Sequence, residues 1–372
     1  MKRKKPNLQP EWDIIFPHLI ARWRKLMRLP LGPEDRLQTR EFQSLIRDFL
    51  AYKESRDLSS IESLGAYLLY EWPLHYAEGL SLIKELPKVP TRMLEIGAKG
   101  AAFSLAALQH GATEAFAIDN NELALAYGAD IAGHLGHPIS VRTADPKQLK
   151  SLPIEGKWDL IVLPYSLFTF FDSTEAQFLY IQKLLRLLSF EGHLLIVESS
   201  ATEVNQRFLA LRDAIASSPI PIVAPCLWKG ACPALKHGSS HCFAQRPLDN
   251  KPNMIKDIQR AAKINLSSLK MSYLILGSLH SHVKPLPETL YRIISPPVDT
   301  FKGERFFLCG VKGKKTLGTT LKEHPKQSRA FEYLKRGDVI AVENAVELDN
   351  DLQITEQTSL QLYAPCDKPL PK

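Results

Sequence analysis

The chain has 372 residues, 45% of them hydrophobic, which is enough for one large domain with additions or for two domains. Its 47 Lys and Arg against 40 Asp and Glu give a net charge of +7, an excess compatible with a nucleic-acid partner that does not by itself establish one. No apolar run reaches the about 18 residues of a membrane span, and no secretory signal follows the first residues, so we expect a cytoplasmic protein without a membrane partner.

Residues 1–88 are predicted to form an N-terminal helical region. Apolar residues recur at three-and-four spacing from Ile14 to Leu26, with basic residues between them, which predicts a basic amphipathic helix. This helix could be a docking element with a solvated charged face, or an arm that contacts RNA phosphates. A second helix is expected over residues 61–85, broken or kinked at Pro73.

Residues 89–312 alternate short apolar runs with helical segments, a pattern typical of an α/β fold with a parallel sheet. We predict a Rossmann-like, seven-stranded sheet that ends in a hairpin, with strands at 92–96, 114–118, 139–142, 159–163, 193–198, 272–277 and 305–311. Helices are predicted at 101–109, 122–134, 174–188 and 203–216. A cysteine-rich insertion occupies 221–250, and residues 313–372 are expected to form a small β-rich appendage with a strand at 352–354.

A candidate cofactor site follows the first predicted strand. Glu95 ends this strand, and Gly97 and Gly100 lie in the turn before a helix, where small residues let backbone N–H groups approach a ligand. Asp119 ends the next strand, about 20 residues further on, where a carboxylate can hold both hydroxyls of a ribose. Asp145 follows the third strand, in the place for contacts to the edge of an adenine.

Together these positions resemble the fold of class I S-adenosylmethionine-dependent methyltransferases. Lys99 and Ala101 stand where that fold usually has its second and third glycines, so the Lys99 side chain either crowds the methionine end of the cofactor or points outward. A dinucleotide dehydrogenase is the competing interpretation, and a Rossmann-like scaffold without a ligand is another. The terminal strand pair and Glu95 favour the methyltransferase.

Pro164 and Tyr165 are the candidate catalytic residues, because they end the fourth strand beside the expected methyl group. Methyl transfer from a sulfonium is an in-line displacement, in which a protein mainly positions the two reactants. Amino-methyltransferases have an Asn/Asp-Pro-Pro-Tyr motif at this place, of which this chain keeps only Pro-Tyr. A strand end packed by an aromatic residue is the alternative interpretation.

Four of the five cysteines form a candidate metal site. The spacing is Cys226-x5-Cys232-x9-Cys242, and Cys309 in the last predicted strand adds a fourth thiol. Four thiolates suit zinc or an iron-sulfur cubane, although this is not the tight spacing of a zinc finger. His237 and His241 could replace one of these thiolates, although a surface or supporting role is favoured for each, and disulfides or buried thiols remain the alternative to a metal site.

The residues further resemble the methyltransferase-like proteins of the small ribosomal subunit, a family of bacteria and mitochondria. The resemblance covers roughly residues 60–315. It rests on Ala66 to Ala77, Val197-Glu198, Arg207 to Leu209, Arg212 to Ala214, Pro225-Cys226, Cys232-Pro233, Cys242 to Arg246 and Cys309-Gly310. The histidine that the family has after the first Cys-Pro is replaced by Leu227-Trp228, and its Glu-Pro-Gly-Thr-Pro appears as residues 198–202.

The resemblance implies a [4Fe-4S] cluster on Cys226, Cys232, Cys242 and Cys309, an S-adenosylmethionine pocket, and binding to small-subunit rRNA. Basic residues flank the cysteines and could form one face toward rRNA or an ordinary solvated surface: Lys251, Lys256, Arg260, Lys263, Lys270, Lys312, Lys314 and Lys315. We expect an rRNA methyltransferase with a structural cluster, present as a monomer. The alternatives are a non-catalytic assembly factor on the same scaffold and a zinc-stabilised small-molecule methyltransferase.

Overall fold

The computed structural model describes residues 10–149, 154–236, 241–281, 285–300, 303–318, 329, 333–366 and 368–370. The chain divides into two units. The first unit comprises Met1–Ile83, Val89–Pro164 and Arg246–Leu269, and the second comprises Lys84–Lys88, Tyr165–Gln245 and Lys270–Lys372. The predicted division at residues 88 and 312 stays a prediction. No helix in the described part of the chain is long and apolar enough to cross a membrane.

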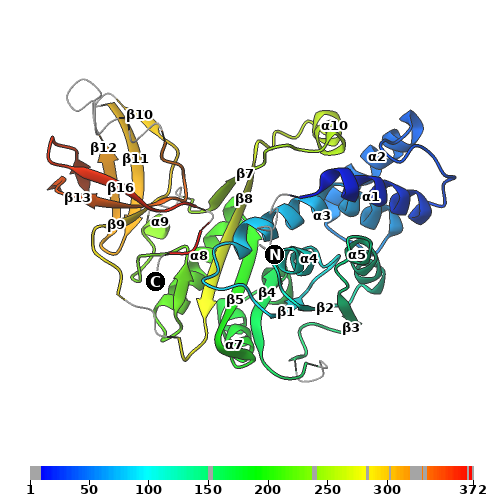
Figure 1. Cartoon of the computed structure of the whole chain (residues 1–372), viewed down its shortest axis with the longest axis horizontal. Coiled ribbons are helices and arrows are strands. Elements are labelled where there is room, and N and C mark those ends of the chain that lie inside the picture. Colours follow the sequence, from blue (N-terminus) through cyan, green and yellow to red (C-terminus); the bar gives the residue numbers. More distant parts are fainter. Residues whose placement is uncertain are drawn as a thin grey trace, which may run out of the picture. The chain divides into compact units, whose positions relative to one another are not determined.

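The first unit begins with three helices that pack on one another, drawn in blue in Figure 1. They are α1 (Trp12–Leu26), α2 (Thr39–Ser55) and α3 (Ile61–Ile83). α3 runs through Pro73 without interruption, so the helix is not broken there, and a kink stays a prediction. Trp72 and Tyr76 are fully buried on either side of the proline, and this packing offsets the backbone hydrogen bond that proline cannot make.

Four parallel strands follow in the spatial order β3-β2-β1-β4. The elements are β1 (Arg92–Ile96), α4 (Ala102–Gln109), β2 (Glu114–Asp119), α5 (Glu122–His134), β3 (Ser140–Thr143), β4 (Trp158–Pro164) and, later in the chain, α10 (Asn253–Ala261). The side chain of Asn121 caps α5 by accepting the N–H of Ala124 at 2.9 Å. Because the strands are parallel, their carboxyl ends meet at one edge, where open α/β sheets bind ligands.

The second unit contains the antiparallel strands β5 and β8, with β6 on the other side of β8. α7 and α8 pack on each other and on β5. The bounds are α6 (Leu167–Phe170), α7 (Thr174–Leu185), β5 (Leu188–Ser199), α8 (Thr202–Ala216), β6 (Ile222–Ala224), α9 (Pro233–Lys236), β7 (Ala244–Pro247) and β8 (Ser268–Gly277).

A separate sheet in the second unit has the order β14-β15-β12-β11-β9-β13-β16, with β10 beside β11. Its strands, yellow to red in Figure 1, are β9 (Leu290–Ile293), β10 (Val298–Thr300), β11 (Gly303–Gly310), β12 (Gly313–Gly318), β13 (Val339–Glu343), β14 (Val346–Leu348), β15 (Asp351–Gln353) and β16 (Ser359–Ala364). Its own apolar core includes Phe306, Leu308, Leu317 and Ile340.

The predicted α/β fold class is confirmed, but one strand was assigned to the wrong sheet. The run at 305–311 was predicted to close the first sheet, whereas β11 pairs with β9, β10 and β12 in the separate sheet. Phe306 and Leu308 are fully buried in that sheet's core. The position beside β8 belongs instead to β6, a three-residue strand between Pro221 and Pro225. Short proline-flanked strands occur at sheet edges and give little periodic signal.

Candidate cofactor site and cysteine cluster

The loop between β1 and α4 has left-handed backbone at every second residue. The φ angles are 72° at Gly97, 48° at Lys99 and 53° at Ala101. A residue with a side chain pays about 1 kcal/mol for this conformation, which glycine adopts freely. The loop therefore has the backbone of a Gly-x-Gly-x-Gly turn, although two of its three glycine positions carry side chains.

Asp119 lies against this loop at the end of β2 and is only 6% exposed. One carboxylate oxygen accepts the N–H of Lys99 at 2.9 Å, and the other accepts that of Asn121 at 2.8 Å. Gly97 also donates its N–H to the Ile118 carbonyl at 2.9 Å. The structure thus brings together the predicted loop and the predicted ribose-binding carboxylate, and each carboxylate oxygen keeps acceptor capacity for a ligand hydroxyl.

Gly100 is required by packing. Its carbonyl accepts the indole N–H of Trp72 at 2.7 Å, and a Cβ added at Gly100 would lie 2.6 Å from the Trp72 ring. A Cβ at Gly128 would lie 2.2 Å from the Gly100 carbonyl oxygen. Gly100 therefore lets α3 and α5 approach the loop, and a direct contact with a cofactor stays a prediction.

Glu95 supports the loop through a hydrogen bond to the first turn of α4. It is fully buried, and its carboxylate accepts the N–H of Ser104 in the first turn of α4 at 2.6 Å. Burial raises the pKa of this carboxyl to about 7, although the hydrogen bonds from Ser104 and Phe103 favour its charged form. Glu95 thus acts on the loop through α4.

Replacing Glu95 with glutamine should change how stability depends on pH. The pKa of Glu95 in the folded state lies above the 4.5 of a free glutamate, so its contribution to stability is full below about 4.5 and is lost as pH rises through about 7. Glu95→Gln should therefore gain stability relative to the unchanged protein between about pH 5 and about pH 8 in urea denaturation. The same pH dependence in both proteins would contradict this assignment.

Asp145 and Pro164 lie at the same edge of the parallel strands. Asp145 is exposed, and its carboxylate accepts the Lys147 N–H at 3.0 Å and the Gln148 side-chain amide at 2.9 Å, so it caps its own turn. Pro164 ends β4, which pairs with β1. Contact of either residue with a cofactor stays a prediction.

Tyr165 begins the next segment with a left-handed φ of 53°. Its N–H donates to the Val197 carbonyl at 2.7 Å, and the residue is half-buried. A non-glycine residue held in this conformation is uncommon and is often found at functional sites. The catalytic assignment of Tyr165 stays a prediction that this backbone geometry supports.

One face of α3 carries titratable residues that the sequence interpretation missed. Tyr67, Glu71 and His75 follow at spacings of four, and the Lys99 amino group lies over the Tyr67 ring, 5.9 Å from its centroid. Burial lowers the pKa of His75 to about 3, so this imidazole is neutral near pH 7. The spacing of four is visible in the sequence, but only the contact between Lys99 and Tyr67 shows that this face of α3 lies beside the candidate cofactor loop.

Glu71 ties this face to α2. It accepts the Tyr52 hydroxyl at 2.6 Å and pairs with Arg56. Burial opposes ionisation of Glu71, but the charges of Arg56 and Lys99 and the hydrogen bond from Tyr52 favour the carboxylate, and the pKa of Glu71 is lowered. A negative charge is thereby held within the electrostatic reach of Lys99.

In the second unit, the four candidate cysteine ligands lie within electrostatic reach of one another. Burial and then the charges of the Cys226 and Cys232 thiolates raise the pKa of Cys242 to about 12. The pKa of Cys309 is raised by burial and by the other three thiolates. Such coupling requires thiols that lie near one another. Within the described ranges, no group of three or more His, Cys, Asp or Glu side chains is arranged to hold a metal ion.

Of the two histidines near the cysteines in the sequence, His241 and His237, the structure describes only His241. His241 is exposed, and its Nε2 lies 3.0 Å from the Thr202 hydroxyl. This position is consistent with the predicted surface role. His237 falls outside the described residues.

Arginines surround the cysteines. Arg212 in α8 is 2% exposed and hydrogen-bonds the Trp228 and Gly230 carbonyls, while the neighbouring Asp213 carboxylate accepts the Cys232 N–H at 2.9 Å. Arg336 lies over the Phe243 ring at 4.0 Å. In the described part of the chain, the Nε atoms of both arginines are buried without a hydrogen-bond partner. Buried donors of this kind fit an anionic group held by the four thiols.

Comparison with known proteins identifies one family. The sequence model of the family described as mitochondrial small ribosomal subunit Rsm22 matches residues 62–340, more than half of the chain. No curated protein sequence matches the chain significantly.

Two methyltransferases of known structure are among the proteins to which this chain is similar. The ribosomal protein L11 methylase of Lactobacillus delbrueckii subsp. bulgaricus is 17% identical, with 41% of this chain and 71% of that chain covered and a TM-score of 0.32. The N-methyltransferase NodS of Bradyrhizobium japonicum, in complex with S-adenosyl-l-homocysteine, is 15% identical, with 64% and 97% covered and a TM-score of 0.38. Both TM-scores lie below 0.5, so neither likeness decides the fold family or the reaction of this chain.

Proposed function

The chain belongs to the Rsm22 family of the mitochondrial small ribosomal subunit, and we propose that it is an S-adenosylmethionine-dependent methyltransferase that acts on small-subunit rRNA. One observation carries the enzymatic part of the proposal. The left-handed loop of Gly97, Lys99 and Ala101 meets the Asp119 carboxylate at the carboxyl ends of parallel strands. The family description supports the ribosomal part.

The residues of the first unit fit this cofactor. Backbone N–H groups of the loop and the free acceptor capacity of Asp119 would hold its polar groups, and Asp145 would lie toward the adenine. The cofactor supplies an electrophilic methyl group. In this proposal the protein orients the acceptor atom for in-line attack, with Pro164 and Tyr165 as the groups that bind the acceptor.

Replacing Asp119 with asparagine should weaken cofactor binding by about ten- to a hundredfold, because hydrogen bonds to a charged group are lost. Asparagine can still accept one loop N–H, so the fold should persist. Calorimetric titration with S-adenosylhomocysteine measures the affinity, and thermal melting checks the fold. Asp35→Ala, at an exposed aspartate of the first unit, is the matched control and should bind like the unchanged protein. Equal affinities in all three proteins would remove Asp119 from the site.

For the second unit we propose a structural [4Fe-4S] cluster on Cys226, Cys232, Cys242 and Cys309. The coupled thiols and the Nε donors of Arg212 and Arg336, which have no partner among the described residues, support an anionic group. The cluster would cross-link the loop after β6 to β11. Anaerobic purification should give about four irons and a matching amount of sulfide per chain. One zinc without colour would replace the cluster by a structural zinc site.

A non-catalytic assembly factor is the second candidate, and Lys99 favours it. This residue places a long side chain at a glycine position of the loop and is half-exposed. If it excludes the cofactor, the calorimetric titration should show no binding, whereas association with the small subunit should persist. That result would exclude the methyltransferase and support the non-catalytic assembly factor.

The location proposed for the protein is inferred from its proposed partner, the small ribosomal subunit. The family description names the mitochondrial small subunit, so we replace the cytoplasmic expectation with location at the small ribosomal subunit. Binding to rRNA and the monomeric state belong to the same proposal. Co-sedimentation of the protein with small subunits in a sucrose gradient tests the location.

A further inference from the structure

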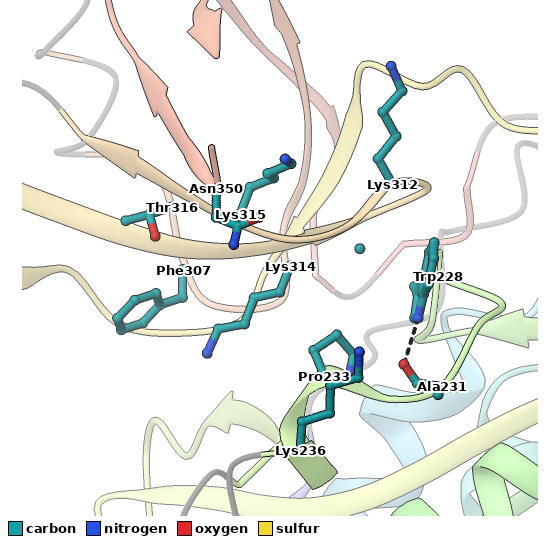
Figure 2. Close-up of a pocket in the computed structure, with 11 residues that line it drawn as sticks. Trp228, Ala231, Pro233, Lys236, Phe307, Lys312, Lys314, Lys315, Thr316 and Asn350 are labelled. Carbon is teal, nitrogen blue, oxygen red and sulfur yellow. Dashed lines mark hydrogen bonds between the residues drawn. The ribbon is translucent and has the colours of Figure 1, made fainter. Parts of the chain in front are cut away.

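A cavity of about 420 Å³ opens in the second unit, beside the cysteine segment. Its walls come from the loop between β6 and α9, from α9, and from β11 and β12. Figure 2 shows the aromatic rings of Trp228 and Phe307 on opposite sides, with the side chains of Lys314 and Lys236 between them. Lys312 and Lys315 complete a basic lining.

Among the described residues, the lining contains four lysines and no aspartate or glutamate, so its charge is positive. Lys315 is buried and already paired with Glu347, which makes it a structural residue. Lys312 pairs with Glu288 at 2.7 Å on the surface, a pair worth little that a phosphate can displace. In the described part of the chain, no carboxylate forms an ion pair with Lys236 or Lys314. Two to three cations are therefore available to an anionic ligand.

Trp228 is held in position before any ligand arrives. Its indole N–H donates to the Ala231 carbonyl at 2.8 Å, as the dashed line in Figure 2 marks. Gly230 packs against the ring so closely that an added Cβ would lie 2.3 Å from it. The buried Arg212 fixes the carbonyls of Trp228 and Gly230. A fixed aromatic ring loses little entropy on binding, which favours stacking with a flat ligand.

Phe307 and Lys314 form the opposite wall. Phe307 is 37% exposed, and the Lys314 amino group lies 4.9 Å from the centroid of its ring. Phe307 therefore offers a partly open ring, with the Lys314 ammonium group over it.

We propose that this pocket binds one nucleotide of single-stranded RNA, with the base against Trp228 and the phosphate between Lys236 and Lys314. An aromatic ring beside cations is the arrangement with which proteins hold unpaired nucleotides, whereas a duplex keeps its bases stacked inside. The inference rests on the proposed function, because small-subunit rRNA supplies the strand. The pocket inference adds to that function the place where the protein contacts the rRNA and the expectation that the contacted RNA is single-stranded.

The pocket shares its backbone with the cysteine cluster. Trp228 lies between Cys226 and Cys232, and Cys309 pairs directly with Lys314 across β11 and β12. Changes that loosen the cysteines should therefore also loosen the pocket.

Fluorescence anisotropy of the full chain with a labelled single-stranded RNA of about 12 nucleotides, at several KCl concentrations, tests the proposal. Trp228→Leu should weaken binding about tenfold through loss of stacking. Lys236→Ala and Lys314→Ala should each lower the slope of log Kd against log salt by about 0.7. Lys183→Ala, at an exposed lysine of α7 outside the pocket, is the matched control. Thermal melting confirms that each variant is folded.

Unchanged affinity and slope in both Trp228→Leu and Lys314→Ala would overturn the pocket, while RNA binding by the unchanged chain would leave the rRNA partner intact. An equal loss in Lys183→Ala would overturn it too, because any basic surface would then suffice. Absence of RNA binding by the unchanged chain would remove the rRNA partner together with the pocket. Displacement of the RNA by inorganic phosphate at constant ionic strength would reduce the pocket to a general anion site.

Discussion

Replacing Cys232 with serine should abolish cluster binding and lower the free energy of unfolding by about 4 kcal/mol or more. Loss of a metal site belongs to the few single changes that reach this size, because the binding energy of the ligands is coupled to folding. Cys232 is 8% exposed, and its backbone N–H donates to the Asp213 carboxylate. Because this hydrogen bond fixes the backbone, the segment cannot shift to bring another side chain to the position of the lost thiol. Iron content and urea denaturation under anaerobic conditions measure both effects.

The chain offers a matched control in Cys366, which lies outside the four-cysteine set and is half-buried. Cys366→Ser should keep the iron content and change stability by less than about 1 kcal/mol. Unchanged iron content and stability in Cys232→Ser would remove the cluster from the account. Equal losses in both serine variants would indicate a general dependence on thiols.

Replacing Arg212 with methionine should cost about 3 kcal/mol of stability. The side chain is 2% exposed and pairs with Asp213 at 2.7 Å, so its removal leaves two carbonyls without their donor and the Asp213 carboxylate without its cationic partner. Breaking a buried pair by removing one partner costs about 3–5 kcal/mol, and the partial exposure of Asp213 places this case at the lower end. Urea denaturation measures the loss.

Arg207 on the same helix is the matched control, because it is exposed and stacks on Phe168 at 4.8 Å. Arg207→Met should cost less than about 1 kcal/mol. Arg212→Lys keeps the charge but loses the fork of donors, so an intermediate stability is expected. If the Arg212 and Arg207 methionine variants are equally stable, Arg212 does not anchor the cysteine loop.

Much of the fold could be predicted from local patterns. The helix predicted at 122–134 is α5 with the same bounds, and the strand predicted at 92–96 is β1. Both combine a clear hydrophobic pattern with turn or cap residues at their ends. The pairing of the strand at 305–311 could not be predicted, because its burial pattern fits either sheet and only long-range contacts decide between them.

The candidate site was predictable where its residues stand in order along the chain, as Gly97 and Asp119 do. The face of Glu71 and His75 required the contact between α3 and the loop. The pocket of Trp228 and Lys314 joins segments more than 80 residues apart, which no local spacing connects. Functional residues that lie within one local motif can therefore be predicted from the sequence, whereas sites formed by distant segments can be recognised only in the folded chain.

Transfer of a labelled methyl group from S-adenosylmethionine to the rRNA of immature small subunits tests the central claim most directly. We expect label in the rRNA with the unchanged protein and a loss of about tenfold or more with Asp119→Asn at limiting cofactor. Label at the level of a reaction without protein, from a preparation that is folded and binds the cofactor, would contradict methyl transfer to rRNA.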